Sequence, residues 1–177
     1  MALQVNLRRW RKADCERLAE LANNRKIWLN LRDRFPFPYT QADAEGWITH
    51  CETEPGTQTQ FAIEVDSKVV GGVGLESLGD VNRIGAEIGY WIGEPYWGRG
   101  IATAALVEAS RRAFKEFPFE RLQAMVYEWN PASMRVLEKA GYQFEGRLRR
   151  SIVKDGQVID SLIYTRLRGS ELRRRSG

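Results

Sequence analysis

Residues 94–103, EPYWGRGIAT, hold two closely spaced glycines between two segments of clear periodicity. The preceding segment, 84–92, has the pattern of a β-strand, and the following segment, 100–115, has the apolar spacing of an α-helix. Gly98 and Gly100 lack a Cβ, so backbone N–H groups in this turn can approach a ligand closely. The first N–H groups of a helix have no partner within it and attract anions. We therefore expect a pyrophosphate to bind at this turn.

This turn matches neither of two common nucleotide motifs in full. The lysine and hydroxyl residue that end a P-loop are missing, and the dinucleotide pattern G-x-G-x-x-G is broken at Thr103. The segment 97–102 instead resembles the Q/R-x-x-G-x-G/A motif of the GNAT superfamily of N-acetyltransferases. Gly100 and Ala102 match that motif, whereas Trp97 departs from its first residue. The alternative is an ordinary strand–helix connection whose glycines serve only tight packing.

The segment 130–144, NPASMRVLEKAGYQF, carries the second informative pattern. Asn130 suits an N-cap, Pro131 the first helical position and Gly141 the left-handed position just past the end, so a short helix is predicted over 130–140. This punctuation explains Ser133 poorly, because Glu or Gln would stabilise the first turn better at that position.

The same segment resembles the GNAT pattern N-x-x-S followed by G-[YF]. The resemblance implies that Asn130 contacts the pantetheine arm of acetyl-CoA and that Ser133 lies beside its sulfur. Other branches carry a tyrosine where this chain has Leu137, which leaves Ser133 as the candidate catalytic residue. The sequence YWGRG, residues 96–100, is similar to the branch that acetylates the N-termini of ribosomal proteins. An exposed serine without a catalytic role is the alternative.

The expected elements follow each other in the order β-α-α-β-β-β-α-β-α-β-β. They are a strand at 5–10, helices at 12–23 and after Thr40, strands at 58–65, 68–76 and 84–92, a helix at 100–115, a strand at 122–127, a helix at 130–140 and strands at 142–153 and 158–167. A further short helix is expected around 27–31. This order also resembles the GNAT fold. We expect an α/β (α+β) fold with a mixed central sheet of about seven strands, splayed central strands and flanking helices. Residues 1–168 are expected to form one domain, and residues 169–177 a basic C-terminal tail.

Composition excludes several classes of protein. The chain has 177 residues, 43% of them apolar, and a net charge of +4. Two cysteines make no disulfide framework and fit the reducing cytoplasm. No signal peptide is expected, and no segment approaches the roughly 20 apolar residues needed to span a bilayer. The single histidine, His50, argues against a His-based metal site and a Ser-His-Asp triad.

Strand alternation places Glu87 on the same face as Gly85, Gly89 and Trp91. The two glycines leave room for a ligand, so Glu87 is the candidate catalytic base, acting through water. An ion-paired or solvent-facing strand residue is the alternative. In the GNAT fold the strands at 84–92 and 122–127 separate below the cofactor, and the backbone edge near Trp91 and Ile92 can bond the pantetheine amides.

The candidate binding residues form two sets. Those expected to bind acetyl-CoA are Trp91, Ile92, Trp97, Gly98, Arg99, Gly100, Ile101, Ala102, Thr103 and Asn130. Those expected to bind the acceptor are Phe35, Tyr39 and Trp47, for which packing of the core is the alternative, with Asp160 as a fallback. Ribosomal-protein enzymes of the similar branch carry a catalytic glutamate where this chain has Ile152, which counts against a strict match to their mechanism and substrate.

The resemblance implies an N-acetyltransferase that moves an acetyl group from acetyl-CoA to a primary amine by direct attack in a ternary complex, without a metal. The acceptor is left open among a protein N-terminus, a free amino acid and a small amine. One alternative is a non-catalytic module that senses acyl-CoA. Another is an RNA- or ribosome-associated protein that uses the basic C-terminal third, which lacks an aromatic stacking platform. We expect a cytoplasmic protein without membrane or nucleic-acid partners, and leave a homodimer open.

Overall fold

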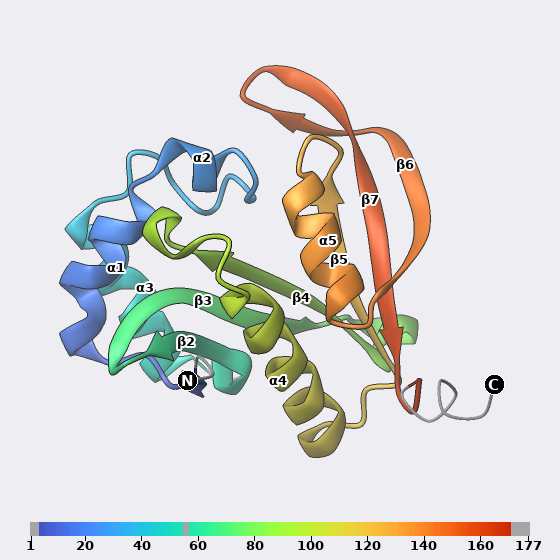
Figure 1. The fold of residues 1–177 in the computed structure, drawn as a ribbon, viewed down its shortest axis with the longest axis horizontal. Helices are drawn as coiled ribbons and strands as arrows, with labels where there is room; N and C mark the ends of the chain where they lie inside the picture. The colour runs from blue at the N-terminus through green and yellow to red at the C-terminus, as the bar shows by residue number, and fades with distance from the viewer. Residues whose placement is uncertain (1–3, 55–56, 171–177) are drawn as a thin grey trace.

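The computed structural model describes residues 4–54 and 57–170, so the predicted basic tail lies mostly outside the described residues. Its seven-stranded sheet has the order β1-β2-β3-β4-β5-β7-β6 (Figure 1). The strands are β1 (Val5–Arg8), β2 (Gln60–Val65), β3 (Lys68–Ser77), β4 (Gly85–Ile92), β5 (Arg121–Tyr127), β6 (Gln143–Lys154) and β7 (Gln157–Leu167). The helices are α1 (Cys15–Ala22), α2 (Arg25–Trp28), α3 (Gln41–Thr53), α4 (Ile101–Glu116) and α5 (Pro131–Lys139). The predicted fold class is confirmed.

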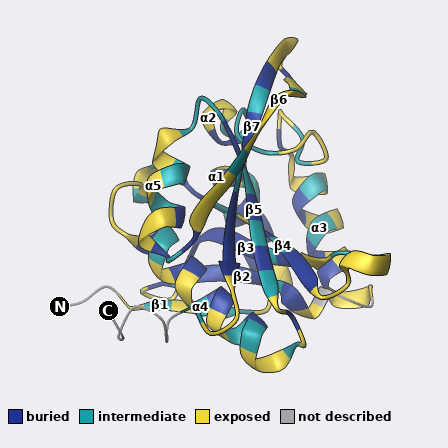
Figure 2. Ribbon diagram, turned by 90° about the vertical axis from the view of Figure 1, so that its right-hand side faces the viewer, coloured by how far each residue is buried: buried dark blue, intermediate teal, exposed yellow. Residues whose placement is uncertain are grey.

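Two groups of helices cover the two faces of the sheet. Leu106 of α4 and Leu137 of α5 are fully buried in the larger core with Ile88 of β4. Leu18 of α1 and Ile48 of α3 are buried in a second core on the other side. Figure 2 shows the dark, buried strands between these helices. Among the described residues, none of the helices is long and apolar enough to cross a membrane.

Local signals predicted several turns correctly. The two-residue connection between β2 and β3 has positive φ at Asp66 (49°) and Ser67 (61°), the geometry of a tight hairpin turn. Thr40 caps α3, since its hydroxyl accepts from the Asp43 N–H at 3.2 Å. The predicted helix at 12–23 differs, because Lys12–Asp14 form a 3₁₀ turn before α1 begins.

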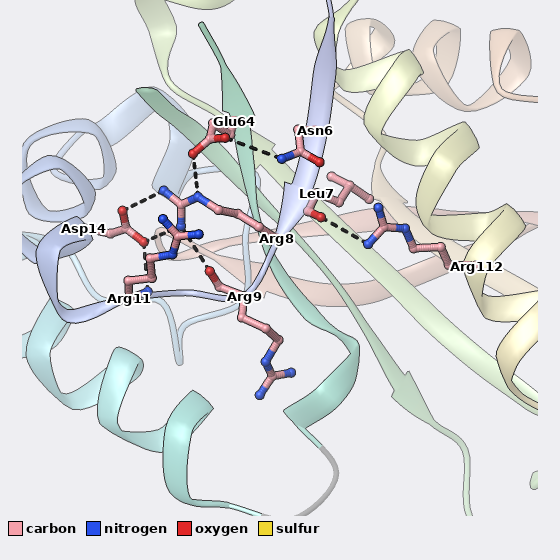
Figure 3. A network of polar contacts seen from close by, with 8 residues as sticks. All are labelled: Asn6, Leu7, Arg8, Arg9, Arg11, Asp14, Glu64 and Arg112. Carbon is pink, nitrogen blue, oxygen red and sulfur yellow. Dashed lines mark hydrogen bonds and ion pairs between the residues drawn. The ribbon is translucent and has the colours of Figure 1, made fainter. Parts of the chain in front are cut away.

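A charged cluster ties β1 to its neighbours (Figure 3). The guanidinium of Arg8 donates to both carboxylate oxygens of Asp14, at 2.7 and 2.9 Å, and to Glu64 of β2 at 2.5 Å. Arg112 of α4 donates to the Leu7 carbonyl at 3.1 Å. The edge strand β1 is thereby joined to the turn before α1, to β2 and to α4.

Candidate active site

The site begins where β4 and β5 separate. These strands pair in parallel only over Gly85–Glu87 and Arg121–Gln123, and beyond Glu87 no residue of β4 pairs with β5 in the described chain. On its other side β4 stays paired with β3 as far as Ile92. The predicted splaying of the central strands is therefore present, and one backbone edge of β4 lies open along its second half.

Strand geometry decides which backbone groups face this gap. The Ile84 carbonyl accepts from Glu120 N–H beside β5 at 2.8 Å, whereas Gly93 N–H donates to Val70 of β3 at 2.8 Å. Successive residues direct their backbone groups to opposite sides, so even-numbered residues of β4 face β5. The residues facing the gap are Ile88, Tyr90 and Ile92. Trp91, predicted to bond pantetheine through its backbone, directs that backbone to β3.

Of the two backbone groups of Ile92 that face the gap, the carbonyl already accepts a hydrogen bond. The indole N–H of Trp97 donates to the Ile92 carbonyl at 2.6 Å. That contact fixes the turn to the end of β4. The guanidinium of Arg99, two residues further on, lies 5.6 Å from the Tyr96 ring centroid.

The turn at 98–103 has the geometry of an anion cradle. Gly98 and Gly100 have φ of 74° and 77°, values that favour glycine, and a Cβ at either would meet nothing within 4 Å. Gly100 caps α4 without a side-chain hydrogen bond. The N–H groups of Ile101, Ala102 and Thr103 therefore have no capping partner among the described residues. These features fit a pyrophosphate.

Asn130 and Ser133 lie on the α5 side of the gap. The Asn130 side chain accepts from the Ser133 N–H at 3.1 Å, which confirms the predicted cap. The Ser133 hydroxyl lies 2.7 Å from the phenol oxygen of Tyr90 on β4. Tyr90 was not among the predicted site residues, because alternation places its side chain on the core face and its partner is 43 residues away.

A cavity of about 1170 Å³ lies on the other side of β4. Its lining includes Phe35, Tyr39 and Trp47, the predicted acceptor wall, together with Trp91. Phe35 packs edge-on against Trp91, with ring centroids 5.7 Å apart. The structure thus brings the aromatic residues of the loop before α3, of α3 and of β4 around one space.

Glu87 also lines this cavity. Its carboxylate pairs with Arg32 in the loop after α2, which sequence reasoning missed because that loop is 55 residues away. The ion-paired alternative for Glu87 is confirmed, whereas its role as the catalytic base stays a prediction. Gly89 is open as predicted, whereas Gly85 is closely packed, because a Cβ added there would lie 3.2 Å from the Leu78 side chain.

Carboxylates outnumber guanidinium groups in the lining. The acidic residues are Asp43, Glu54, Glu76 and Glu87, and the basic ones are Arg32 and Arg34. Glu76 pairs with Arg34 as Glu87 pairs with Arg32. An excess of negative charge at the wall favours a cationic ligand over an anionic one.

Asp160 lies apart from this lining. Its carboxylate accepts from the Arg150 N–H at 2.7 Å and from Arg147 at 2.5 Å. These two bonds hold its pKa below the usual range. These bonds give Asp160 a structural role within the β6–β7 hairpin. The residue of this hairpin that lines the cavity is Ile152 of β6.

Neither cysteine is suited to act as a nucleophile. Cys15 and Cys51 are both buried. Burial raises the pKa of Cys15, and it raises the pKa of Cys51 to about 11, so both thiols are protonated at neutral pH. Within residues 4–54 and 57–170, no group of three or more metal-ligating side chains comes together.

The gap has a turn lined by N–H groups at one end and carboxylates beyond the other. This arrangement suits a transferase that moves a group from a phosphate-bearing donor to a basic acceptor. The family follows from comparison with known sequences. The model of the acetyltransferase (GNAT) domain matches residues 4–143, and the chain belongs to that family. It is an N-acetyltransferase that uses acetyl-CoA.

The relatives include enzymes for different acceptors. YdaF, a candidate ribosomal N-acetyltransferase of Bacillus subtilis (strain 168), is 32% identical over 173 residues, covering 93% of this chain and 91% of YdaF. Spermidine N(1)-acetyltransferase of Escherichia coli (strain K12) is 26% identical over 161 residues, covering 91% of this chain and 84% of the enzyme. Mycobacterium smegmatis RimJ in complex with CoA-disulfide matches with a TM-score of 0.82 at 25% identity, covering 93% of this chain and 82% of RimJ. The predicted resemblance is confirmed.

Proposed function

We propose that the protein acetylates a primary amine by direct attack of the amine on acetyl-CoA within a ternary complex. The observation that carries this proposal is the position of Glu87. It is the last residue of β4 to pair with β5, and it lines the aromatic cavity. A base at that point lies between a donor held in the gap and an acceptor held in the cavity.

In this mechanism Glu87, through a water molecule, takes the proton that the acceptor nitrogen loses. The nitrogen forms a bond to the acetyl carbon while the carbon–sulfur bond breaks, and the electron pair of that bond moves to sulfur. The Ser133 hydroxyl donates a hydrogen bond to the departing thiolate. Backbone N–H groups of β4 that face the gap, such as that of Tyr90, can polarise the acetyl oxygen. Holding the two reactants in the right orientation lowers the activation barrier by several kcal/mol.

The acceptor class proposed is a protein N-terminus or a small amine that carries positive charge. The acidic excess of the cavity lining supports a cationic acceptor. Two relatives point the same way, since one is a candidate ribosomal acetyltransferase and the other acetylates spermidine. Arg32 and Arg34 at the same wall reduce the local negative charge, which favours a monoamine over a long polycation.

A panel of amines with acetyl-CoA as donor tests this function. Peptides with free N-termini, amino acids and polyamines are compared by the rate of free CoA release, and the product is identified by mass. We expect turnover on at least one amine and a clear preference between peptides and small amines. A folded protein that binds acetyl-CoA but turns over no amine would support the alternative, an acyl-CoA sensor.

A further inference from the structure

Tyr90 of β4 and Ser133 of α5 meet beside the gap between β4 and β5. The phenol oxygen lies 2.7 Å from Ser133 Oγ and 3.4 Å from the Ser133 carbonyl oxygen. Tyr90 is three residues beyond Glu87, where β4 no longer pairs with β5. The pair therefore stands inside the opening in which the proposed function places the thioester.

The chain contains a second tyrosine–serine pair, in which the direction of each hydrogen bond can be assigned. Tyr142 OH lies 2.8 Å from Ser110 Oγ in the core. Ser110 donates its own proton to the Leu106 carbonyl at 2.7 Å, so Tyr142 must be the donor in that pair. In this pair every hydroxyl proton is used within the core.

Ser133 differs from Ser110 in one respect. In the described part of the chain, its Oγ has no partner besides Tyr90, because its place in the first turn of α5 leaves no carbonyl one turn earlier within the helix. A serine hydroxyl can donate one hydrogen bond and accept two. If the phenol donates to Ser133 Oγ, the serine proton is free to point into the gap.

The charge state of Tyr90 agrees with a donor. Burial raises its pKa to about 12, although the bond to Ser133 acts in the opposite direction. The phenol therefore carries its proton throughout the neutral range. A phenol is also a better hydrogen-bond donor than an alcohol, because it is the stronger acid.

We propose that Tyr90 is a positioning residue, which donates to Ser133 Oγ and thereby aims the serine proton at the sulfur atom that leaves. This inference rests on the proposed function. No proton passes from Tyr90 in the reaction. The carbon–sulfur bond gives its electron pair to sulfur, the Ser133 hydrogen bond stabilises the thiolate, and the proton lost by the amine leaves through Glu87.

The test uses CoA itself and needs no acceptor. The thiol of CoA bound to the protein is titrated by the ultraviolet absorbance of its thiolate, in the wild type, Tyr90→Phe, Ser133→Ala and Tyr142→Phe. A hydrogen bond to the thiolate lowers the thiol pKa. We expect both site variants to reduce the thiolate fraction at a fixed pH by about three- to tenfold, the effect of one hydrogen bond. Tyr142→Phe should titrate like the wild type.

Kinetics on an accepted amine give the second measurement. Tyr90→Phe should lower kcat about three- to tenfold with an unchanged KM for acetyl-CoA, and should have no further effect in the Ser133→Ala background. An unchanged thiol titration in Tyr90→Phe, a loss of CoA binding, or an equal loss of kcat in both backgrounds would overturn the proposal. If the wild type turns over no amine, the proposed function fails, and the titration still decides the role of Tyr90.

Discussion

At the residue scale, two paired glutamates, of which Glu76 is the more exposed, make the role of Glu87 separable. Glu76 of β3 lies directly opposite Glu87 in the antiparallel pair, both line the cavity, and each pairs with an arginine of the loop after α2. They differ in position, because only Glu87 is on the strand that borders the gap. A general charge effect would involve both, whereas base catalysis would involve one.

We expect Glu87→Gln to lower kcat by about 10²-fold, the lower end for a general base. Glutamine keeps the shape and removes the proton acceptor, so the loss reports chemistry. If Glu87 only binds the cationic amine, the variant should instead raise the acceptor KM and leave kcat intact.

Steady-state kinetics on the preferred amine separate these outcomes, with Glu76→Gln as the matched control, which should keep the wild-type kcat. Wild-type kcat, KM and pH profile in Glu87→Gln would reject both roles.

Residues such as Glu87 show what alternation predicts and what it misses. The period of two placed Glu87 and Trp91 on the ligand face, and the structure puts both in the cavity lining. The pairing of Arg32 with Glu87 and the contact of Tyr90 with Ser133 could not be predicted, because each joins segments more than 40 residues apart. Asp160 is held away from the cavity by Arg147 and by the Arg150 backbone.

At the element scale, the turn into α4 can be tested by one glycine. Gly100→Val should weaken acetyl-CoA binding by at least about tenfold, roughly 1.4 kcal/mol, because a side chain would occupy the cradle and the φ of 77° disfavours valine. Calorimetry on the folded variant measures this.

Gly169→Val is the control, since Gly169 has φ of 75° and open space but lies beyond β7. It should carry similar backbone strain and bind acetyl-CoA normally. Unchanged affinity in Gly100→Val would remove the pyrophosphate from this turn.

The β1 cluster gives the fold a pH dependence of known sign. The Arg8 hydrogen bond lowers the pKa of Glu64 in the folded state. Because folding lowers this pKa, the ionised carboxylate stabilises the fold at any pH above the pKa of the unfolded chain, about 4.3. That contribution is lost as the pH falls through the pKa of the folded state.

We expect Glu64→Gln to unfold with roughly 1 kcal/mol less free energy than the wild type at neutral pH. The difference should shrink below about pH 4.3. Urea unfolding across this range measures it, and a difference that grows on acidification would contradict the ion pair.

Helix and strand boundaries were predicted best where capping and turn residues lie at the ends of the element itself. Asn130, Pro131 and Gly141 bound α5 as expected. The predicted strand at 84–92 began one residue early, since Ile84 precedes β4 and is 56% exposed although it is apolar. β6 contains two register shifts, and Arg150 there takes a φ of 52°, which no local pattern predicts.

At the scale of the whole molecule, the order of elements predicted the sheet, but it could not predict the cavity. The cavity draws its wall from α3, from the loop before it, from β2 to β5 and from Ile152 of β6. Its charge balance depends on side chains that meet only after the chain folds. One arginine of the basic C-terminal third, Arg168, is held by the backbone before β5, since it donates to the carbonyls of Phe114, Phe117 and Phe119.

The central claim is direct transfer from acetyl-CoA to an amine while both are bound. Initial rates measured with both substrates varied, on the amine preferred in the panel, test it most directly. The buried, protonated thiols of Cys15 and Cys51 leave no cysteine nucleophile, so the reciprocal plots should intersect. Parallel lines, with an acetylated protein detected by mass after exposure to acetyl-CoA alone, would contradict the account.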